Sequence, residues 1–308
     1  MRAAIGRTRS AVARGARSVL STAGVRGLAV ETAWTATHLA TYPLGFARQQ
    51  ARERPGPNTL DRLSPVQRGL LLGDVEAAGT PIVLLHGWVD NRSIFTLLRR
   101  HLLRRGFGRV VTMNYSVFTH DVPKAAARLA TLVEALCEET GYERVHVVGH
   151  SMGGLVARYY VQRLGGDARV HTLATLGTPH AGTRAAQLFV GRAVAQLRPG
   201  SPILAELAQP AAGCRTRFVA VWSDLDAMVV PKESARLDHP DLRARNVFVR
   251  GVGHLSLPID GRVVQEIVAT FAHLDPEGAA IVAPLASPAR PRRRHDPVPP
   301  TAEAGESG

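Results

Sequence analysis

The feature that most restricts the fold is a glycine-rich turn between an apolar run and a helical pattern. Residues 144–150 read RVHVVGH, a run typical of a buried strand, and residues 154–164 follow with helical spacing as GLVARYYVQRL. The turn between them reads GHSMGG, from Gly149 to Gly154. Gly149 and Gly153 remove side chains where strand and helix must come close. The pattern therefore predicts a strand–turn–helix unit that carries Ser151 at its sharp turn.

The rest of the central region alternates short apolar runs with helical patterns in the same way. We expect strands at residues 81–86, 109–115, 144–150, 170–177, 217–223 and 246–251, and helices near residues 92–105, 122–140, 152–164 and 263–274. Such alternation is typical of parallel βαβ construction, and continuous Val/Ile/Leu strands indicate a sheet that is covered on both faces. The predicted fold class is α/β, with a mostly parallel central sheet and helices on both faces.

The 308 residues suffice for one large domain with additional arms. Residues 1–55 form a basic N-terminal arm, and residues 56–283 form the predicted domain. A short covering segment is expected within that domain at about residues 181–212. Residues 284–308 are rich in Pro, charge and small polar residues, so we expect a disordered C-terminal tail.

The positive charge is concentrated in the arm. The formal net charge is +13, of which residues 1–55 carry +7, residues 284–308 carry +1 and the predicted domain +5. The domain has no zinc-finger spacing and no RNA-binding signature, so we expect no nucleic-acid partner. The two cysteines, Cys137 and Cys214, form no metal motif, and no cofactor is expected.

Two interpretations of the arm are open. Residues 27–47 are mildly apolar but too polar for a membrane span, in part because of Glu31, and no secretory signal precedes them. A cytoplasmic location is therefore expected. In the first interpretation, residues 1–50 attach to an anionic membrane surface. In the second, they pack on the domain as a helix or form a partly disordered arm. The second interpretation is favoured, because basic amphipathic stretches are common; the first would use an apolar face of Trp34, Leu39 and Tyr42.

Three further segments carry residues suited to acyl-transfer chemistry. LLHGW, residues 84–88, ends a strand in a turn where the Trp88 backbone N–H can point at a substrate carbonyl oxygen, whereas His86 suits a structural hydrogen bond. VWSDLDAMVVPKESA, residues 221–235, runs from a strand into a loop with two acids, Asp224 and Asp226. Asp226 is favoured because the apolar run that follows would pack beneath a histidine; Asp224 would be solvated or would cap the turn.

The histidine that fits these residues is His254. It follows a strand in RGVGHLSLP, residues 250–258, and the glycines of this loop suit an imidazole that must reach Ser151 while its other nitrogen faces a carboxylate. It also completes the chain order serine, acid, histidine that the nucleophile-elbow topology prescribes.

Taken together, these motifs and LGTPHAGT, residues 176–183, resemble the bacterial lipase and esterase families of the α/β-hydrolase superfamily, especially the compact members with a small lid. The resemblance covers about residues 81–274 and implies a carboxylic ester hydrolase that acts on lipid or long-chain acyl esters without a metal or cofactor. By this resemblance LGTPHAGT lines the acyl cleft, and residues 197–207 form the covering segment. The implied site consists of the nucleophile Ser151, the acid Asp226, the base His254 and the oxyanion donors Trp88 and Met152.

The substrate is the least determined part of the prediction. Acyl transfer or thioester hydrolysis would use the same residues, and a non-catalytic protein of this fold that binds a membrane or a partner is a different class of hypothesis. Six apolar residues suit an acyl cleft and equally suit ordinary packing: Leu176, Leu188, Phe189, Val190, Ile203 and Leu204.

Overall fold

The computed structural model describes residues 27, 29, 31–33, 75–88, 92–115 and 121–272. The predicted boundaries near residues 55 and 283, the C-terminal tail and most of the basic arm lie outside the described residues. Within the described ranges, no helix combines the length and the hydropathy that a membrane span requires.

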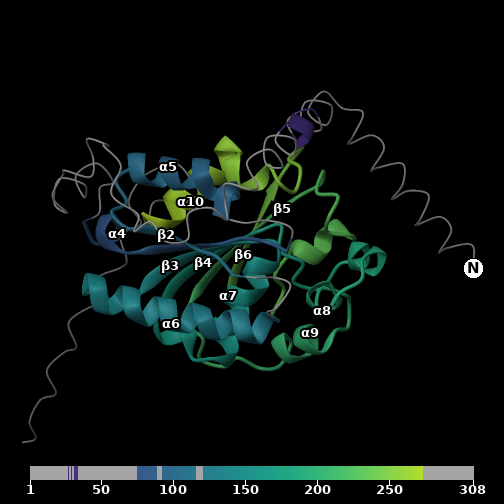
Figure 1. Ribbon diagram of the computed structural model, residues 1–308, viewed down its shortest axis with the longest axis horizontal. Helices are drawn as coiled ribbons and strands as arrows, with labels where there is room; N and C mark the ends of the chain where they lie inside the picture. The colour runs from purple at the N-terminus through teal and green to yellow at the C-terminus, as the bar shows by residue number, and fades with distance from the viewer. Residues whose placement is uncertain are drawn as a thin grey trace, which may run out of the picture.

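The centre of the molecule is a parallel sheet of six described strands (Figure 1). Their order across the sheet is β2-β1-β3-β4-β5-β6, and each neighbouring pair is parallel. The strands are β1 (Ile82–Leu85), β2 (Val110–Met113), β3 (Val145–His150), β4 (Val170–Leu176), β5 (Arg217–Ser223) and β6 (Arg243–Val249). Each of the six strands overlaps an apolar run that predicted it, and the predicted α/β fold class is confirmed.

Helices cover both faces of the sheet (Figure 1). One face carries α6 (Val122–Thr140) and α7 (Met152–Arg163), and the other carries α5 (Thr96–Arg104) and α10 (Gly261–Phe271). A short helix, α4 (Val75–Gly79), precedes β1. The two-residue period of β1 divides the core: Val83 and Leu85 pack with α6 and α7, whereas Ile82 and Leu84 pack with α5 and α10.

Local capping explains where the long helices begin and end. Asp121 accepts a hydrogen bond from the Lys124 N–H at the start of α6, and Gly141 ends that helix in a left-handed conformation. Asp260 accepts from the N–H groups of Arg262 and Val263 and starts α10 at Gly261, two residues before the predicted start. The predicted end of this helix, residues 273–274, lies outside the described residues.

The starts of β6 and of the helix expected from residue 92 also differ from the prediction. β6 begins at Arg243 rather than at residue 246, since it pairs with β5 at one edge of the described sheet and exposes Arg243 and Arg245. The helix expected from residue 92 begins as a 3₁₀ turn, Arg92–Phe95, before α5.

The parallel sheet places several loops at one edge. The segments that follow β1, β3, β5 and β6 all leave the carboxyl ends of their strands, so residues 86–88, 151, 224–226 and 250–256 gather there. Between β4 and β5 lie the 3₁₀ turn η4 (Arg184–Leu188) and the short helices α8 (Arg192–Ala195) and α9 (Pro202–Leu207). These elements lie within residues 181–212, the part of the sequence for which a covering segment was predicted.

We expect Gly153→Ala to destabilise the fold because α7 packs directly on the end of β1. A Cβ at Gly153 would lie 2.4 Å from the Leu85 carbonyl oxygen and 2.6 Å from that of His86. Overpacking of this kind costs about 1–3 kcal/mol in the free energy of unfolding, which urea titration measures.

Gly261→Ala is the matched control. A Cβ at this first residue of α10 meets nothing within 4 Å. We expect its free energy of unfolding to equal the wild-type value or to exceed it by about 0.5–1 kcal/mol. Equal urea midpoints for the two variants would contradict the close packing of α7 on β1.

Candidate active site

Ser151 occupies the turn between β3 and α7 with a strained backbone. Its φ is 54° and its ψ is −125°, and among the described residues it is the non-glycine residue with a positive φ. Such conformations cost about 1–3 kcal/mol and persist only where the surroundings enforce them. Hydrogen bonds from the Ser151 N–H to the Leu176 carbonyl oxygen (2.9 Å) and from the Gly154 N–H to the Ser151 carbonyl oxygen (3.1 Å) hold the turn.

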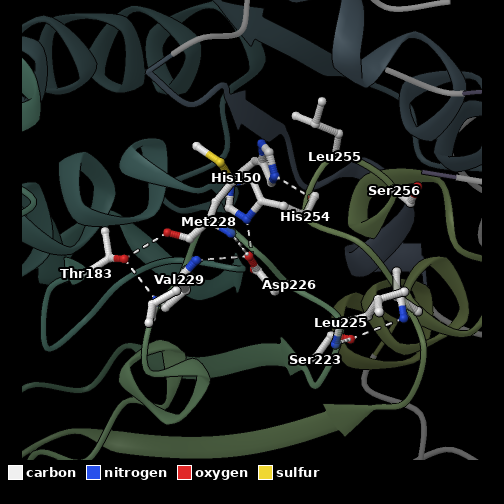
Figure 2. A network of polar contacts seen from close by, with 12 residues as sticks. His150, Thr183, Ser223, Leu225, Asp226, Met228, Val229, His254, Leu255 and Ser256 are labelled. Carbon is white, nitrogen blue, oxygen red and sulfur yellow. Dashed lines mark hydrogen bonds and ion pairs between the residues drawn. The ribbon is translucent and has the colours of Figure 1, made fainter. Parts of the chain in front are cut away.

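Asp226 and His254 form a buried hydrogen-bonded pair (Figure 2). The distance from His254 Nδ1 to Asp226 Oδ2 is 2.8 Å, and the two side chains are 4% and 2% exposed, respectively. The other carboxylate oxygen accepts the backbone N–H groups of Met228 (2.9 Å) and Val229 (3.0 Å). A buried carboxylate is tolerated where hydrogen bonds replace its hydration, and this loop supplies them.

Asp224 lies elsewhere in the same loop. Its Oδ1 accepts the Gly251 N–H at 2.7 Å, while Ser223 Oγ accepts the N–H of Val252 at 3.2 Å. These contacts tie the residues that precede His254 to the end of β5. Of the two acids left open by the sequence, the structure therefore brings Asp226 to the imidazole and uses Asp224 to hold the loop.

His150 is a contact of His254 for which the sequence suggested no role. It is fully buried next to Ser151, and its Nε2 donates to the His254 carbonyl oxygen at 3.0 Å (Figure 2). The two rings lie 4.7 Å apart between centroids at an angle of 44°. The backbone of the histidine loop is thereby tied to the end of β3.

Ser151 and His254 line one pocket together with Trp88. Its volume is only about 30 Å³, and the rest of its described lining is mostly apolar: Pro179, Thr183, Ala185, Ala186, Phe189, Val194, Leu197, Met228 and Val229. Phe189 contacts Trp88 edge-on, with 5.3 Å between ring centroids. A second cavity, of about 440 Å³, lies beside Gly27 and the 250–262 region, and its described lining includes none of Ser151, Asp226 and His254.

The remaining predicted site residues lie at the same edge. Met152 is the first residue of α7 and is buried, and Trp88 follows the end of β1. His86 makes one hydrogen bond within its own turn and one to the segment after β2. Its Nδ1 donates to the Gly87 carbonyl oxygen at 2.9 Å, and its Nε2 accepts from the Tyr115 N–H at 3.4 Å. This is the structural role that its position before the elbow predicted.

The six apolar residues that suited either an acyl cleft or ordinary packing divide between the pocket, the core and the surface. Phe189 is the one member of that set in the described pocket lining. Leu176 and Leu204 are buried in the hydrophobic core and Ile203 packs against it, whereas Leu188 and Val190 are exposed. Helical spacing marks an apolar face without saying whether it covers core or cavity, which is why the sequence could not separate them.

Thr183 is a pocket residue whose only signal was its place in LGTPHAGT. Its hydroxyl donates to the Met228 carbonyl oxygen at 2.8 Å and accepts the N–H groups of Val230 (2.9 Å) and Ala185 (3.2 Å). It therefore joins the start of η4 to the loop that carries Asp226 (Figure 2).

His180, in the same motif, is buried against Arg158. The Arg158 Nη1 lies 3.5 Å from His180 Nδ1, and because arginine can only donate, Nδ1 is the acceptor. The proton of the neutral ring is therefore on Nε2, which donates to Thr175 Oγ1 at 3.0 Å. Burial, reinforced by the Arg158 charge, holds the pKa of His180 well below its usual range. Arg158 itself has its pKa lowered to about 10 by burial and donates to the Leu207 carbonyl oxygen at the end of α9.

Among the described residues, no group of three or more His, Cys, Asp and Glu side chains is arranged to hold a metal ion.

Comparison with known proteins agrees with this architecture. A family model described as alpha/beta hydrolase fold matches residues 80–209. The crystal structure of Aspergillus fumigatus lipase B is similar with a TM-score of 0.56 and 15% identity, over 63% of this chain and 52% of that chain. The mature form of Bacillus licheniformis lipase BlEst2 is similar with a TM-score of 0.54 and 18% identity, over 63% of this chain and 92% of that chain.

Identities this low establish likeness of fold alone. The protein has the α/β-hydrolase fold, with a distant structural similarity to lipases and esterases.

We expect His180 to make stability depend on pH. Its folded pKa is depressed, so below about pH 6.5 the unfolded chain binds a proton that the folded chain does not. The contribution of His180 to the free energy of unfolding is fully present above pH 6.5. Below that pH it falls by up to about 1.4 kcal/mol per pH unit.

His180→Gln removes this titration and keeps an acceptor for Arg158. Urea unfolding from pH 8 to pH 5 measures the free energy of unfolding of both proteins. The amount by which the wild-type value exceeds the variant value should decrease below pH 6.5. Parallel curves for the two proteins would show that His180 is not held neutral.

Proposed function

We propose that the protein is a serine hydrolase that cleaves carboxylic esters, with Ser151 as nucleophile, His254 as general base and Asp226 as the partner of the base. The observation that carries the proposal is the buried Asp226–His254 pair, whose imidazole lines the same pocket as a serine on a strained turn. Structural packing demands none of these three residue types in this arrangement.

The first step of the proposed reaction forms an acyl-enzyme. The Asp226 carboxylate accepts the Nδ1–H of His254 and so leaves Nε2 as the nitrogen that takes the Ser151 proton. The serine oxygen attacks the ester carbonyl carbon, and the carbonyl π electrons move to its oxygen. When the tetrahedral intermediate collapses, the C–O bond to the alcohol breaks and the imidazolium returns the proton to that alcohol.

The oxyanion formed in this step requires N–H donors. We assign these to the backbone amides of Met152 and Trp88, because Met152 begins α7, where helix N–H groups and the helix dipole favour negative charge, and Trp88 lines the same pocket. Each donor of this kind is typically worth about 3 kcal/mol of barrier. Water then repeats the attack on the acyl-enzyme and releases the acid.

Lipid or long-chain acyl esters are the proposed substrates. The pocket beside Ser151 is mostly apolar, and one of its lining side chains, Phe189, is 41% exposed. The two similar structures described above are both named lipases. The pocket volume is about 30 Å³ and the Phe189 ring contacts Trp88 in its lining, so we expect a movement of Phe189 to make room for an acyl chain.

Hydrolysis of p-nitrophenyl esters of graded chain length tests the proposed activity. We expect Ser151→Ala to lower kcat by roughly 10⁶-fold and Asp226→Asn by about 10⁴-fold, because the second change removes the carboxylate that orients the imidazole. Asp224→Asn is the matched control, since this acid binds the Gly251 N–H of the loop and not the imidazole; the decrease in kcat should stay within about a hundredfold.

Three results would overturn this assignment. Ser151→Ala could retain wild-type hydrolysis, Asp224→Asn could be the more damaging change, or the wild type could hydrolyse no ester in the panel. Including thioesters and an alcohol acceptor in the panel separates ester hydrolysis from thioester hydrolysis and from acyl transfer by the same residues.

Phe189→Ala tests the substrate class. Removing the ring should open the pocket and raise the ratio of kcat/KM for the decanoate ester to that for the butyrate ester by about tenfold. Val190→Ala, at an exposed neighbour outside the described pocket lining, should leave this ratio unchanged. An equal ratio in all three proteins would place the acyl chain elsewhere.

A further inference from the structure

One residue of the N-terminal arm contacts the loop that carries His254. The Glu31 carboxylate accepts the Leu255 N–H at 2.8 Å, the Ser256 N–H at 2.9 Å and the Ser256 hydroxyl at 2.6 Å. The two loop residues follow His254 directly, although Glu31 and Leu255 lie 224 positions apart in the chain. Hydrogen bonds to an ionised carboxylate are about twice as strong as those between neutral groups.

The backbone on both sides leaves room for this contact. A Cβ at Gly253 would lie 2.3 Å from Glu31 Cδ, and a Cβ at Gly27 would lie 2.0 Å from the Gly251 carbonyl oxygen. The described residues of this segment are helical: Gly27, Ala29 and Glu31–Ala33. They are drawn in purple in Figure 1, near the loop that carries His254. Glycines on both partners therefore allow the arm to dock closely enough for its carboxylate to reach the loop amides.

His254 lies between two sets of anchors. Asp224 and Ser223 bind the N–H groups of Gly251 and Val252, which precede the histidine, and Glu31 binds those that follow it. A loop that contains two glycines has many accessible conformations, and each anchor removes some of them. The imidazole can face Asp226 and the Ser151 pocket at the same time only while this loop keeps one conformation.

We propose that Glu31 is a positioning residue for His254, through which the N-terminal arm completes the active site. The inference rests on the proposed function, since it assigns a task to the same histidine. It also accounts for the acidic residue that interrupts the apolar stretch of the arm. Because Glu31 acts through the loop, its loss should slow the chemical step more than it weakens substrate binding.

Kinetics of the full-length chain give the first test. We expect Glu31→Ala to lower kcat by about ten- to a hundredfold with KM changed by less than about twofold. Glu31→Gln keeps one acceptor oxygen and should recover part of kcat. Glu138→Gln, which neutralises an exposed glutamate on α6, should have the wild-type kcat.

A spectroscopic readout makes the test independent of turnover. The Nδ1–H proton that His254 shares with Asp226 should give a downfield proton NMR signal in the wild type, assigned by its loss in Asp226→Asn. We expect that signal to shift or broaden in Glu31→Ala and to stay unchanged in Glu138→Gln. Circular dichroism and urea midpoints establish that each protein is folded; if Glu31→Ala does not fold, the isosteric Glu31→Gln supplies the comparison.

The two possible failures are distinguishable. A wild type that hydrolyses no ester overturns the proposed function and leaves the NMR signal to decide the role of Glu31. A folded Glu31 variant with wild-type kcat, or with an unchanged downfield signal, overturns the positioning role.

Discussion

The hydrogen bond between Asp226 and His254 joins two loops that leave neighbouring parallel strands, β5 and β6, at the same edge of the sheet. The pair is buried, so its stability depends on partners for every polar atom that water no longer reaches. The loop after β5 supplies the amides of Met228 and Val229 to the carboxylate, and the same two residues line the pocket beside Ser151. The parallel topology is therefore the condition under which an acid, an imidazole and the Ser151 turn meet.

Two segments at the same edge of the sheet adopt conformations that cost free energy. Ser151 is held with a positive φ, and a glycine-containing loop is held in one conformation around His254. The Leu176 carbonyl oxygen and the Gly154 N–H hold the Ser151 turn. The histidine loop is held by His150 at the end of β3, by Ser223 at the end of β5 and Asp224 directly after it, and by Glu31. Concentrating strain and anchors at one place is typical of sites where side chains must be held in position before a substrate arrives.

The sequence predicted the strands and the strand–turn–helix unit because buried parallel strands are continuous apolar runs and the turn needs glycine at defined positions. It favoured Asp226 over Asp224 from the apolar run that follows, and the structure brings Asp226 to the imidazole. It left the pocket wall open, since an apolar residue at helical spacing such as Leu204 can cover either core or cavity. It allowed the arm to pack on the domain but could not name the partner of Glu31, because a hydrogen bond between residues 224 positions apart leaves no local pattern.

The most direct test of a reactive serine in this pocket is covalent labelling of the folded, full-length protein with a fluorophosphonate, followed by peptide mass spectrometry. The account predicts one equivalent of label on Ser151 and none after the protein is unfolded, because only the assembled pocket with Asp226 and His254 makes the hydroxyl nucleophilic. A label on another residue, or no label on a protein shown to be folded, would contradict it.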